Sequence, residues 1–287
     1  MTEPSNNPVV WVTGAAGLIG NYVVRSSAAP TGVQIVGLAR SELDLLDTAA
    51  VERRFHTDFP SLVIHCAAIS TAAACAKQPE MARRINVEAT RQLADLCSGA
   101  RLILLSTDLV FDGCKGNFVE TDEVNPLNLY AETKVEAEQI VLSNPRNTVI
   151  RTSLNAGISP TGDRSFAEQM RAAWQRGESL KLFTDEFRNP IGADVTARAI
   201  WEIAQSNAAG IFHVAGAEKL SRLQVGQLLA MQWSELDCRM EPASLRDFPG
   251  PPRAADTTLN CVKAQSLLGY PLPCFSNWLR EGELAKP

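Results

Sequence analysis

An apolar run that leads directly into three closely spaced glycines restricts the fold of this chain more than any other feature. The segment VVWVTGAAGLIG at residues 9–20 places Gly14, Gly17 and Gly20 between this run and an apolar helix that begins near Leu18. The first glycine permits a sharp turn, the second lets a ligand approach the backbone, and the third lets helix and strand pack closely. The segment therefore predicts a strand, a tight turn and a helix whose N-terminus faces a phosphate group.

The surroundings of the glycines favour a ligand site over a purely structural turn. The strand before them, the helix after them and a second strand that ends near residue 40 fit a dinucleotide-binding unit. The predicted contacts in this loop are Gly14, Ala16, Gly17, Leu18 and Ile19.

Short apolar runs recur along the first half of the chain, at residues 9–12, 33–38, 62–64, 102–105 and 149–150. Segments of helical length separate them. Buried strands joined by helices indicate a parallel sheet covered on both faces. We therefore expect an α/β fold, with a doubly wound parallel Rossmann sheet and a smaller C-terminal substrate-binding region.

The end of the second strand indicates which dinucleotide binds. Ala39 and Arg40 lie where an NAD site would present an acidic side chain to the ribose 2′-hydroxyl. A guanidinium group can instead donate two charge-assisted hydrogen bonds to a 2′-phosphate, which predicts NADP(H). Asp44 and Leu45 are expected to flank the adenine. A solvated arginine at a strand end is the alternative interpretation of Arg40.

The strand pattern also divides the chain. We expect residues 1–155 to form the NADP-binding Rossmann domain and residues 156–287 to form the substrate-binding region, with residues 191–216 returning to the first domain. The expected elements of the second part are helices at residues 166–176 and 193–205, a strand at residues 211–214 and a helix from Leu223.

Polar side chains follow the strand predicted at residues 102–105. Ser106, Thr107 and Asp108 stand at its carboxyl end, where ligands of open α/β sheets bind. Ser106 is a predicted cofactor contact, Thr107 a predicted catalytic residue and Asp108 a substrate candidate.

Tyr130 and Lys134 lie four residues apart in a predicted helix, so they share one face of it. Reduction of a ketone requires a proton donor, but a free phenol, with a pKa of about 10, holds its proton firmly. We expect Lys134 to lower the pKa of Tyr130 and to bind the nicotinamide ribose, while Thr107 hydrogen-bonds the carbonyl. Both residues are also predicted cofactor contacts. The same spacing arises on exposed helices without function, but the glycine turn and Thr107 precede it in the order that this chemistry requires.

Several segments resemble the extended short-chain dehydrogenase/reductases, within them the dTDP-4-dehydrorhamnose reductase branch. They are VTGAAGLIG, LDLLD, VIHCAA, INVEAT, LLSTDLVFDG, NPLNLYAETKVEAEQ and VIRTS. The resemblance implies catalysis by Thr107, Tyr130 and Lys134 and cofactor contacts at Ala67 and Ala68. It further implies NADPH-dependent reduction of a keto group on a nucleotide-linked sugar.

The resemblance also covers Asn86, in the NV motif of the family. This side chain is expected either to relay protons through a water or to brace strand ends through backbone hydrogen bonds. His65 and Cys66 lie on an apolar strand and are expected to serve in packing.

Two segments depart from the pattern of that branch. Leu154 and Asn155 follow RTS where the branch has a bulky aromatic residue, and residues 187–191 replace a glycine-proline-threonine stretch. Leu154 and Arg188 are therefore substrate candidates. Arg188 is expected to contact an anionic substrate or to form a surface ion pair.

Two other functions stay open at this stage. The regulatory β subunit of methionine adenosyltransferase resembles the same branch and binds NADP as a partner protein, and fold alone does not fix function. An epimerase of nucleotide sugars would use the cofactor in a closed redox cycle.

Composition narrows the cellular setting. The net charge of −5 gives no overall attraction to nucleic acid or anionic lipid. Seven cysteines without a CxxC pair and three scattered histidines predict a reducing compartment and no bound metal. Neither a leader-like N-terminus nor a membrane-length apolar stretch is apparent. We expect a cytoplasmic protein with a small-molecule substrate, for which a homodimer is an open expectation.

Overall fold

The structure is a computed structural model that describes residues 7–250, 252–282 and 284 of the 287-residue chain. The first residues of the expected NADP-binding domain and the last residues of the expected substrate-binding region lie outside the described residues. The same holds for part of the N-terminal segment that was compared with a leader sequence.

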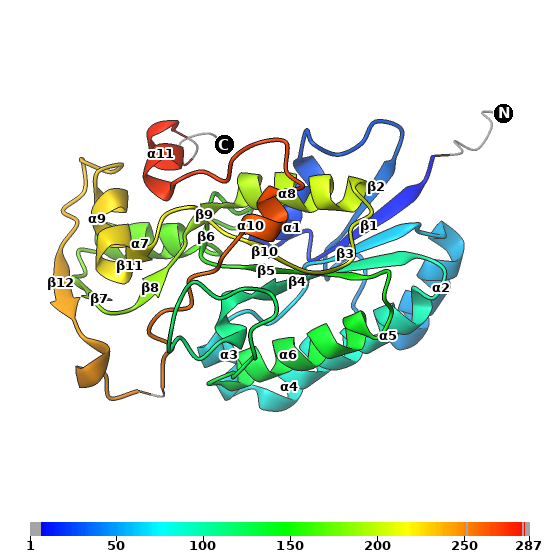
Figure 1. Cartoon of the computed structure of the whole chain (residues 1–287), viewed down its shortest axis with the longest axis horizontal. Coiled ribbons are helices and arrows are strands. Elements are labelled where there is room, and N and C mark those ends of the chain that lie inside the picture. The colour runs from blue at the N-terminus through cyan, green and yellow to red at the C-terminus, as the bar shows by residue number, and fades with distance from the viewer. Residues whose placement is uncertain (1–6, 251, 283, 285–287) are drawn as a thin grey trace.

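A parallel sheet of six strands, in the order β2-β1-β3-β4-β5-β10, forms the centre of the molecule (Figure 1). Its strands are β1 Val9–Thr13, β2 Gln34–Leu38, β3 Leu62–His65, β4 Arg101–Thr107, β5 Thr148–Thr152 and β10 Gly210–Val214. The strands β2 and β3 lie on opposite sides of β1, so the direction in which successive strands are added to the sheet changes at β1. Ligands of open α/β sheets bind at the carboxyl ends of the strands near such a change of direction. The predicted doubly wound parallel sheet is confirmed.

Helices cover both faces of the sheet (Figure 1). On one face lie α1 Leu18–Arg25 and α8 Ala193–Gln205, and on the other lie α2 Thr48–Asp58, α5 Ala89–Leu96 and α6 Leu129–Leu142. Alternate residues of β1 enter the two cores, since Val10 and Val12 pack in one and Trp11 in the other. Burial on both faces explains why the strands are continuous apolar runs.

Smaller elements complete the chain. They are α3 Ala72–Lys77, α4 Pro79–Arg83, a π-helical turn Arg84–Glu88, a 3-10 turn Asp108–Val110, β6 Asn155–Ala156, α7 Phe166–Gln175, β7 Leu180–Phe183, β8 Phe187–Arg188, β9 Ile191–Gly192, β11 Leu220–Ser221, α9 Arg222–Ala230, β12 Met240–Ala243, a 3-10 turn Leu245–Asp247, α10 Val262–Gln265 and α11 Phe275–Arg280. β7 pairs with β12, β8 with β11, and β6 with β9. The helices predicted near α7, α8 and α9 are confirmed, whereas the two-residue strands were not predicted.

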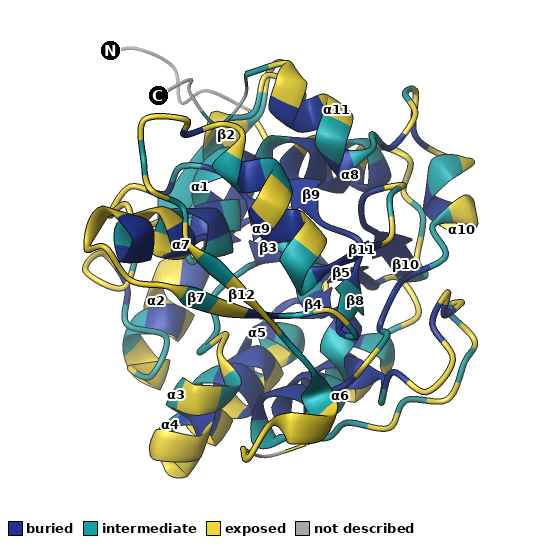
Figure 2. Ribbon diagram, turned by 90° about the vertical axis from the view of Figure 1, so that its left-hand side faces the viewer, coloured by how far each residue is buried: buried dark blue, intermediate teal, exposed yellow. Residues whose placement is uncertain are grey.

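The elements α7, α9, β7, β8, β11 and β12 gather on one side of the sheet layer (Figure 1). Arg188 at the end of β8 contacts Asp108, which directly follows β4, so this group lies at the carboxyl ends of the strands. Figure 2 looks at the molecule from this side and shows the central strands buried, with α3 and α4 largely exposed.

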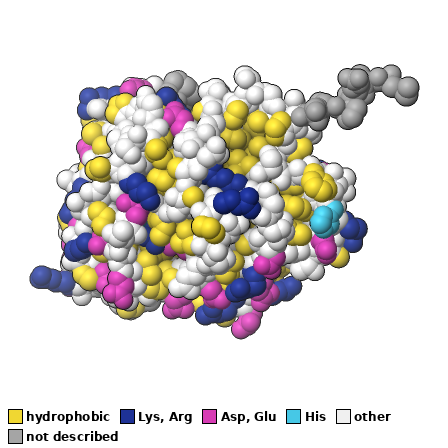
Figure 3. Space-filling model, turned by 45° about the vertical axis from the view of Figure 1, so that its right-hand side comes forward, with side chains coloured by type: hydrophobic (Ala, Val, Ile, Leu, Met, Phe, Trp, Pro, Cys, Tyr) yellow, Lys and Arg dark blue, Asp and Glu magenta, His cyan; other side chains and the backbone are white. Residues whose placement is uncertain are grey.

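The surface drawn in Figure 3 carries basic and acidic side chains interspersed among apolar ones. Within the described part of the chain, no helix combines the length and the apolar composition needed to cross a bilayer. The same residues contain no group of three or more potential metal ligands.

The turn after β1 lies very close to the backbone that follows β3, and this close approach can be tested. Gly14 has a φ of +69°, and a Cβ there would lie 2.8 Å from the backbone nitrogen of Ala67. Gly32 has a similar φ of +80° with nothing within 4 Å. We expect Gly32→Ala to lower the free energy of unfolding by about 1 kcal/mol through backbone strain alone, and Gly14→Ala by about 3 kcal/mol because of the added clash. Urea unfolding followed by circular dichroism measures both, and equal losses would contradict the close-approach explanation.

Candidate active site

The glycine turn forms a cradle at the carboxyl end of β1. The backbone nitrogen of Gly14 donates to the Leu38 carbonyl at 3.0 Å, and that of Gly17 donates to the Gly14 carbonyl at 2.8 Å. Gly17 is the N-cap of α1 and supplies no side-chain cap, so the first amides of this helix remain available to an anion. A Cβ at Gly20 would collide with the Gly14 carbonyl, which shows how closely α1 packs on the turn. This cradle fits the diphosphate of a dinucleotide.

Arg40 lies directly beyond β2. Its side chain is 73% exposed and forms an ion pair with Asp44 at 3.5 Å. An exposed pair of this kind contributes little stability, so the guanidinium group remains free to bind a phosphate. Leu45 is half-buried against the apolar core that contains Trp11. Ala67 and Ala68 follow β3, and the Ala67 backbone faces Gly14.

The last two residues of β4, Ser106 and Thr107, carry hydroxyl groups that bind different partners. The Thr107 Oγ1 atom donates to Asp108 Oδ1 at 3.0 Å and accepts from the Leu109 amide at 3.1 Å. The Ser106 hydroxyl donates to Glu138 Oε1 at 2.5 Å inside the protein. The Ser106 hydroxyl proton is therefore not available to the cofactor while this bond is made, and a cofactor contact of Ser106 stays a prediction.

Tyr130 and Lys134 lie on the buried face of α6, which is capped by the Asn128 side chain accepting from the Ala131 amide at 3.1 Å. The Thr107 side chain acts on the pKa of Tyr130, so the two side chains are neighbours. Lys134 acts electrostatically on Cys66, whose backbone borders Gly14. The structure thus gathers these predicted residues at the edge of the sheet that carries the glycine turn.

The pKa of Tyr130 is raised in this structure, and the expected effect of Lys134 on it stays a prediction. Burial raises the pKa of the phenol, and the negative charge of Asp108 raises it further, while the Thr107 side chain offsets part of the shift. Burial also lowers the pKa of Lys134 to about 8, against the opposing effect of Glu138. Tyr130 is therefore protonated at neutral pH and can act as a proton donor.

A buried ion pair lies behind Lys134. Arg151 on β5 donates from Nη2 to Glu138 Oε2 at 2.7 Å and from Nε to Oε1 at 3.0 Å. His213 on β10 lies 3.4 Å from Arg151 Nη1 through its Nε2 atom, and burial, followed by the Arg151 charge, lowers its pKa to about 3. Sequence reasoning missed Glu138, although its position four residues after Lys134 places it on the same helix face.

The substrate candidates are tied to other groups of the protein. Asp108 Oδ2 accepts from the hydroxyls of Ser153 and Thr257, each at 2.8 Å. It also lies 3.6 Å from Arg188 Nε, and the side chains of Arg188 and Asp108 are 5% and 6% exposed. The ion pair of Arg188 with Asp108 is therefore buried, and the expectation of a surface ion pair is wrong. Arg188 also donates to the Ala254 carbonyl at 3.1 Å.

Leu154 is half-buried, and its carbonyl accepts from the Ile191 amide at 2.9 Å. A contact of Leu154, Asp108 or Arg188 with substrate stays a prediction. Ser153 and Thr257 were missed because nothing in the sequence links them to Asp108.

Asn86 and His65 have structural partners. Asn86 accepts from the Ile69 amide at 2.8 Å and donates to the Ile69 carbonyl at 3.1 Å and to Thr133 at 2.9 Å, which is the bracing role. His65 lies between the hydroxyls of Thr13 and Thr90, at 2.7 and 3.0 Å. Burial, followed by the Lys134 charge, lowers its pKa to about 3, so the ring is neutral and the packing role is confirmed.

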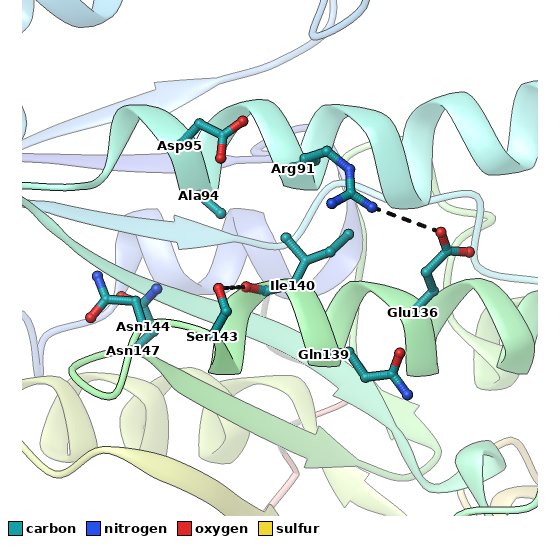
Figure 4. Close-up of a pocket in the computed structure, with 9 residues that line it drawn as sticks. All are labelled: Arg91, Ala94, Asp95, Glu136, Gln139, Ile140, Ser143, Asn144 and Asn147. Atoms are coloured by element: carbon teal, nitrogen blue, oxygen red, sulfur yellow. Dashed lines mark hydrogen bonds and ion pairs between the residues drawn. The ribbon is translucent and has the colours of Figure 1, made fainter.

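A separate hollow of about 440 Å³ opens between α5 and α6 (Figure 4). It is lined by Arg91, Ala94, Asp95, Glu136, Gln139, Ile140, Ser143, Asn144 and Asn147. Tyr130 and Lys134 are buried and do not line it, so it does not belong to the candidate active site.

Comparison with known proteins identifies the family. Residues 9–282 match the family model described as the RmlD substrate binding domain. A dTDP-4-dehydrorhamnose reductase of Mycobacterium tuberculosis is 31% identical, over 87% of this chain and 84% of that protein. The methionine adenosyltransferase 2 subunit beta of Rattus norvegicus is 28% identical, over 90% of this chain and 82% of that protein.

A solved structure shows the same architecture. The dTDP-4-dehydrorhamnose reductase of Clostridium acetobutylicum superposes with a TM-score of 0.86 at 26% identity, covering 95% of this chain and 97% of that one. Together with the family match, this structural likeness shows that the chain belongs to the family of the RmlD substrate binding domain.

Proposed function

We propose that this protein is an NADPH-dependent reductase of a keto group on a nucleotide-linked sugar. The observation that carries the proposal is the grouping of Thr107, Tyr130 and Lys134 beside the glycine turn. The similar proteins of Mycobacterium tuberculosis and Clostridium acetobutylicum, both named dTDP-4-dehydrorhamnose reductase, support the choice of reaction and substrate class.

The chain offers a separate group for each part of the cofactor. The turn from Gly14 to Ile19 would hold the diphosphate through backbone amides, Arg40 the 2′-phosphate and Lys134 the nicotinamide ribose. Bound NADPH supplies the hydride that reduces the carbonyl carbon.

The side chains of the protein handle the carbonyl oxygen. Thr107 orients this oxygen by a hydrogen bond, for which its hydroxyl proton turns from Asp108 to the substrate, and Tyr130 donates its phenolic proton to the same oxygen as charge develops. The ammonium group of Lys134, one helical turn from Tyr130, stabilises the phenolate that remains. Burial of all three side chains strengthens these interactions, because screening by water is reduced.

We retain the division at residue 155 as a proposal, with substrate recognition assigned to residues 156–287. β10 pairs with β5 in the central sheet, which supports the return of residues 191–216 to the first domain. A homodimer and a cytoplasmic location stay predictions.

A regulatory role is the second candidate, favoured by the similarity to the methionine adenosyltransferase subunit of Rattus norvegicus. Screening nucleotide-linked keto sugars for oxidation of added NADPH distinguishes the functions. A reductase consumes NADPH in proportion to substrate, whereas an epimerase shows no net consumption. Absence of turnover together with copurification of a stoichiometric partner would favour the regulatory role.

Removal of the Tyr130 hydroxyl tests the proton donor. We expect Tyr130→Phe to reduce kcat by at least about 100-fold, because proton transfer is lost, with little change in the affinity for NADPH. Tyr270→Phe is the matched control, since the Tyr270 hydroxyl donates to the Val195 carbonyl at 3.0 Å, and this variant should keep its turnover. Steady-state kinetics and cofactor titration measure both variants, and undiminished turnover of Tyr130→Phe would refute the assignment.

Charge reversal at Arg40 tests cofactor selection. Arg40→Asp should shift the preference from NADP toward NAD by at least about tenfold, because the partner of the 2′-phosphate is lost and repulsion is added. Arg176→Asp is the control, since Arg176 is also exposed and paired with an acidic neighbour, Glu178, at 2.6 Å. The ratio of the two dissociation constants is the measurement, and an unchanged ratio would exclude Arg40 as the selecting residue.

A further inference from the structure

The turn that follows β2 folds an acidic side chain back onto the end of the strand. The Glu42 carboxylate accepts a hydrogen bond from the Ala39 amide, with Oε2 2.8 Å from the nitrogen. The Ala39 carbonyl accepts from the amides of Glu42 and Leu43, each at 3.0 Å. Leu43 is buried in the apolar core that contains Trp11, so the turn is anchored to the body of the protein. The Glu42 carboxylate therefore has a defined position at the strand end, although the residue is exposed.

This position belongs to the expected site of the adenosine ribose. The carbonyl of Leu38, the last residue of β2, accepts from the amides of Gly14 and Ala15 at 3.0 and 3.4 Å, so the end of β2 lies against the glycine turn. A dinucleotide whose diphosphate binds this turn extends its adenosine ribose to the end of β2. The acidic side chain that residues 39 and 40 lack is thus supplied by Glu42. Nothing in the sequence marks Glu42 for this place, because only the turn brings it back to the strand end.

The charges in this turn do not balance. Residues 39–46 contain one guanidinium group, that of Arg40, and the two carboxylates of Glu42 and Asp44. Asp44 pairs with Arg40 at 3.5 Å and accepts from the Leu46 amide at 3.0 Å. Each carboxylate is therefore held by a backbone amide, and one negative charge is left over beside the expected ribose.

The two nicotinamide dinucleotides differ in how they interact with this charge. The ribose of NAD presents hydroxyl groups that can donate hydrogen bonds to a carboxylate. The 2′-phosphate of NADP is itself an anion, which a carboxylate repels and which requires N–H donors. Glu42 also occupies the Ala39 amide, a donor that a phosphate could use. On both grounds Glu42 favours NAD, whereas the charge of Arg40 favours NADP.

We propose that Glu42 is a second residue that determines cofactor choice, and that it opposes Arg40 by lowering the preference for NADP over NAD. This inference goes beyond the proposed function and rests on it only for the presence of a nicotinamide dinucleotide at the glycine turn. The effect is electrostatic, because Glu42 and Arg40 act on the same phosphate with opposite charges. The preference of the wild type for NADP is therefore weaker than Arg40 alone would produce.

Equilibrium binding tests this role without turnover. NADP and NAD are titrated by calorimetry into the full-length protein, as are 2′,5′-ADP and 5′-AMP, which differ only in the 2′-phosphate. Glu42→Gln keeps an acceptor oxygen for the Ala39 amide and removes the charge. We expect the ratio of the dissociation constant of NAD to that of NADP to rise by about tenfold, with the same trend for the two fragments. Glu42→Asp, which keeps the charge, should retain most of the wild-type ratio.

Glu52→Gln is the matched control. Glu52 is an exposed glutamate on α2, where its Oε1 atom lies 4.0 Å from His56 Nε2. Its substitution should leave the ratio unchanged. The gain in NADP affinity of Glu42→Gln should also shrink at high ionic strength, because salt screens repulsion between exposed charges. A side chain that only shaped the turn would show no such dependence on salt.

Two results would overturn the inference: an unchanged ratio in Glu42→Gln, or an equal loss of both affinities. Binding of neither dinucleotide by the wild type would overturn the inference and the proposed cofactor together. The proposed function also fails separately. If the ratio changes as expected but no keto sugar is reduced, the role of Glu42 stands and the reductase assignment falls. If a keto sugar is reduced and the ratio is unchanged in Glu42→Gln, the reductase assignment stands and the role of Glu42 falls.

Discussion

The buried ion pair between Glu138 and Arg151 fixes α6 against the sheet, and the geometry of the candidate site depends on it. Both side chains are at most 4% exposed, and the shortest contact between them is 2.7 Å. Ser106 on β4 donates to the same carboxylate, so β4, β5 and α6 meet at one group. Loss of one partner of such a pair leaves a buried charge, which destabilises a protein by about 3–5 kcal/mol. Since Tyr130 and Lys134 share the buried face of α6 with Glu138, any rotation of the helix would displace all three together.

Burial at this site also determines the protonation states. The Tyr130 phenol keeps its proton because a phenolate would be poorly solvated there and would lie near Asp108. His65 and His213 stay neutral for the same reason, since an imidazolium would be desolvated beside Lys134 or Arg151. The site therefore contains a protonated phenol, with neutral imidazoles behind it. This distribution of protons agrees with the proposed role of Tyr130 as proton donor and of Lys134 as the group that stabilises the phenolate.

The periodic parts of the sequence predicted the fold well, because apolar runs of strand length and helices of two or more turns carry their own signal. The strand pairs β6–β9 and β8–β11 have two residues in each strand, too few for any alternation, and form through tertiary contacts. The roles of Thr107, Tyr130 and Lys134 stay predictions, although the structure brings these residues together. The partners of Asp108 could not be predicted, since Thr257 lies 149 positions away in the sequence. Of the two alternatives for Arg188, the surface ion pair is wrong, because sequence does not report which segment covers a side chain.

Buried and half-buried guanidinium groups are accommodated in three different ways in this structure. Arg151 is neutralised by Glu138. Arg101 is not paired with a carboxylate, yet it donates to the carbonyls of Ala204, Ile203 and Ala208 around the C-terminus of α8, where the helix dipole is negative. Its Nε atom has no hydrogen-bond partner in the described part of the chain, but the other two nitrogens anchor it.

Arg222 has neither solution, since it stands at the beginning of α9, where the helix dipole is positive. The first two arrangements hold the sheet together by contacts within the chain. The third places its charge at the carboxyl ends of the strands, where Glu186 and the ring of Phe166 interact with it.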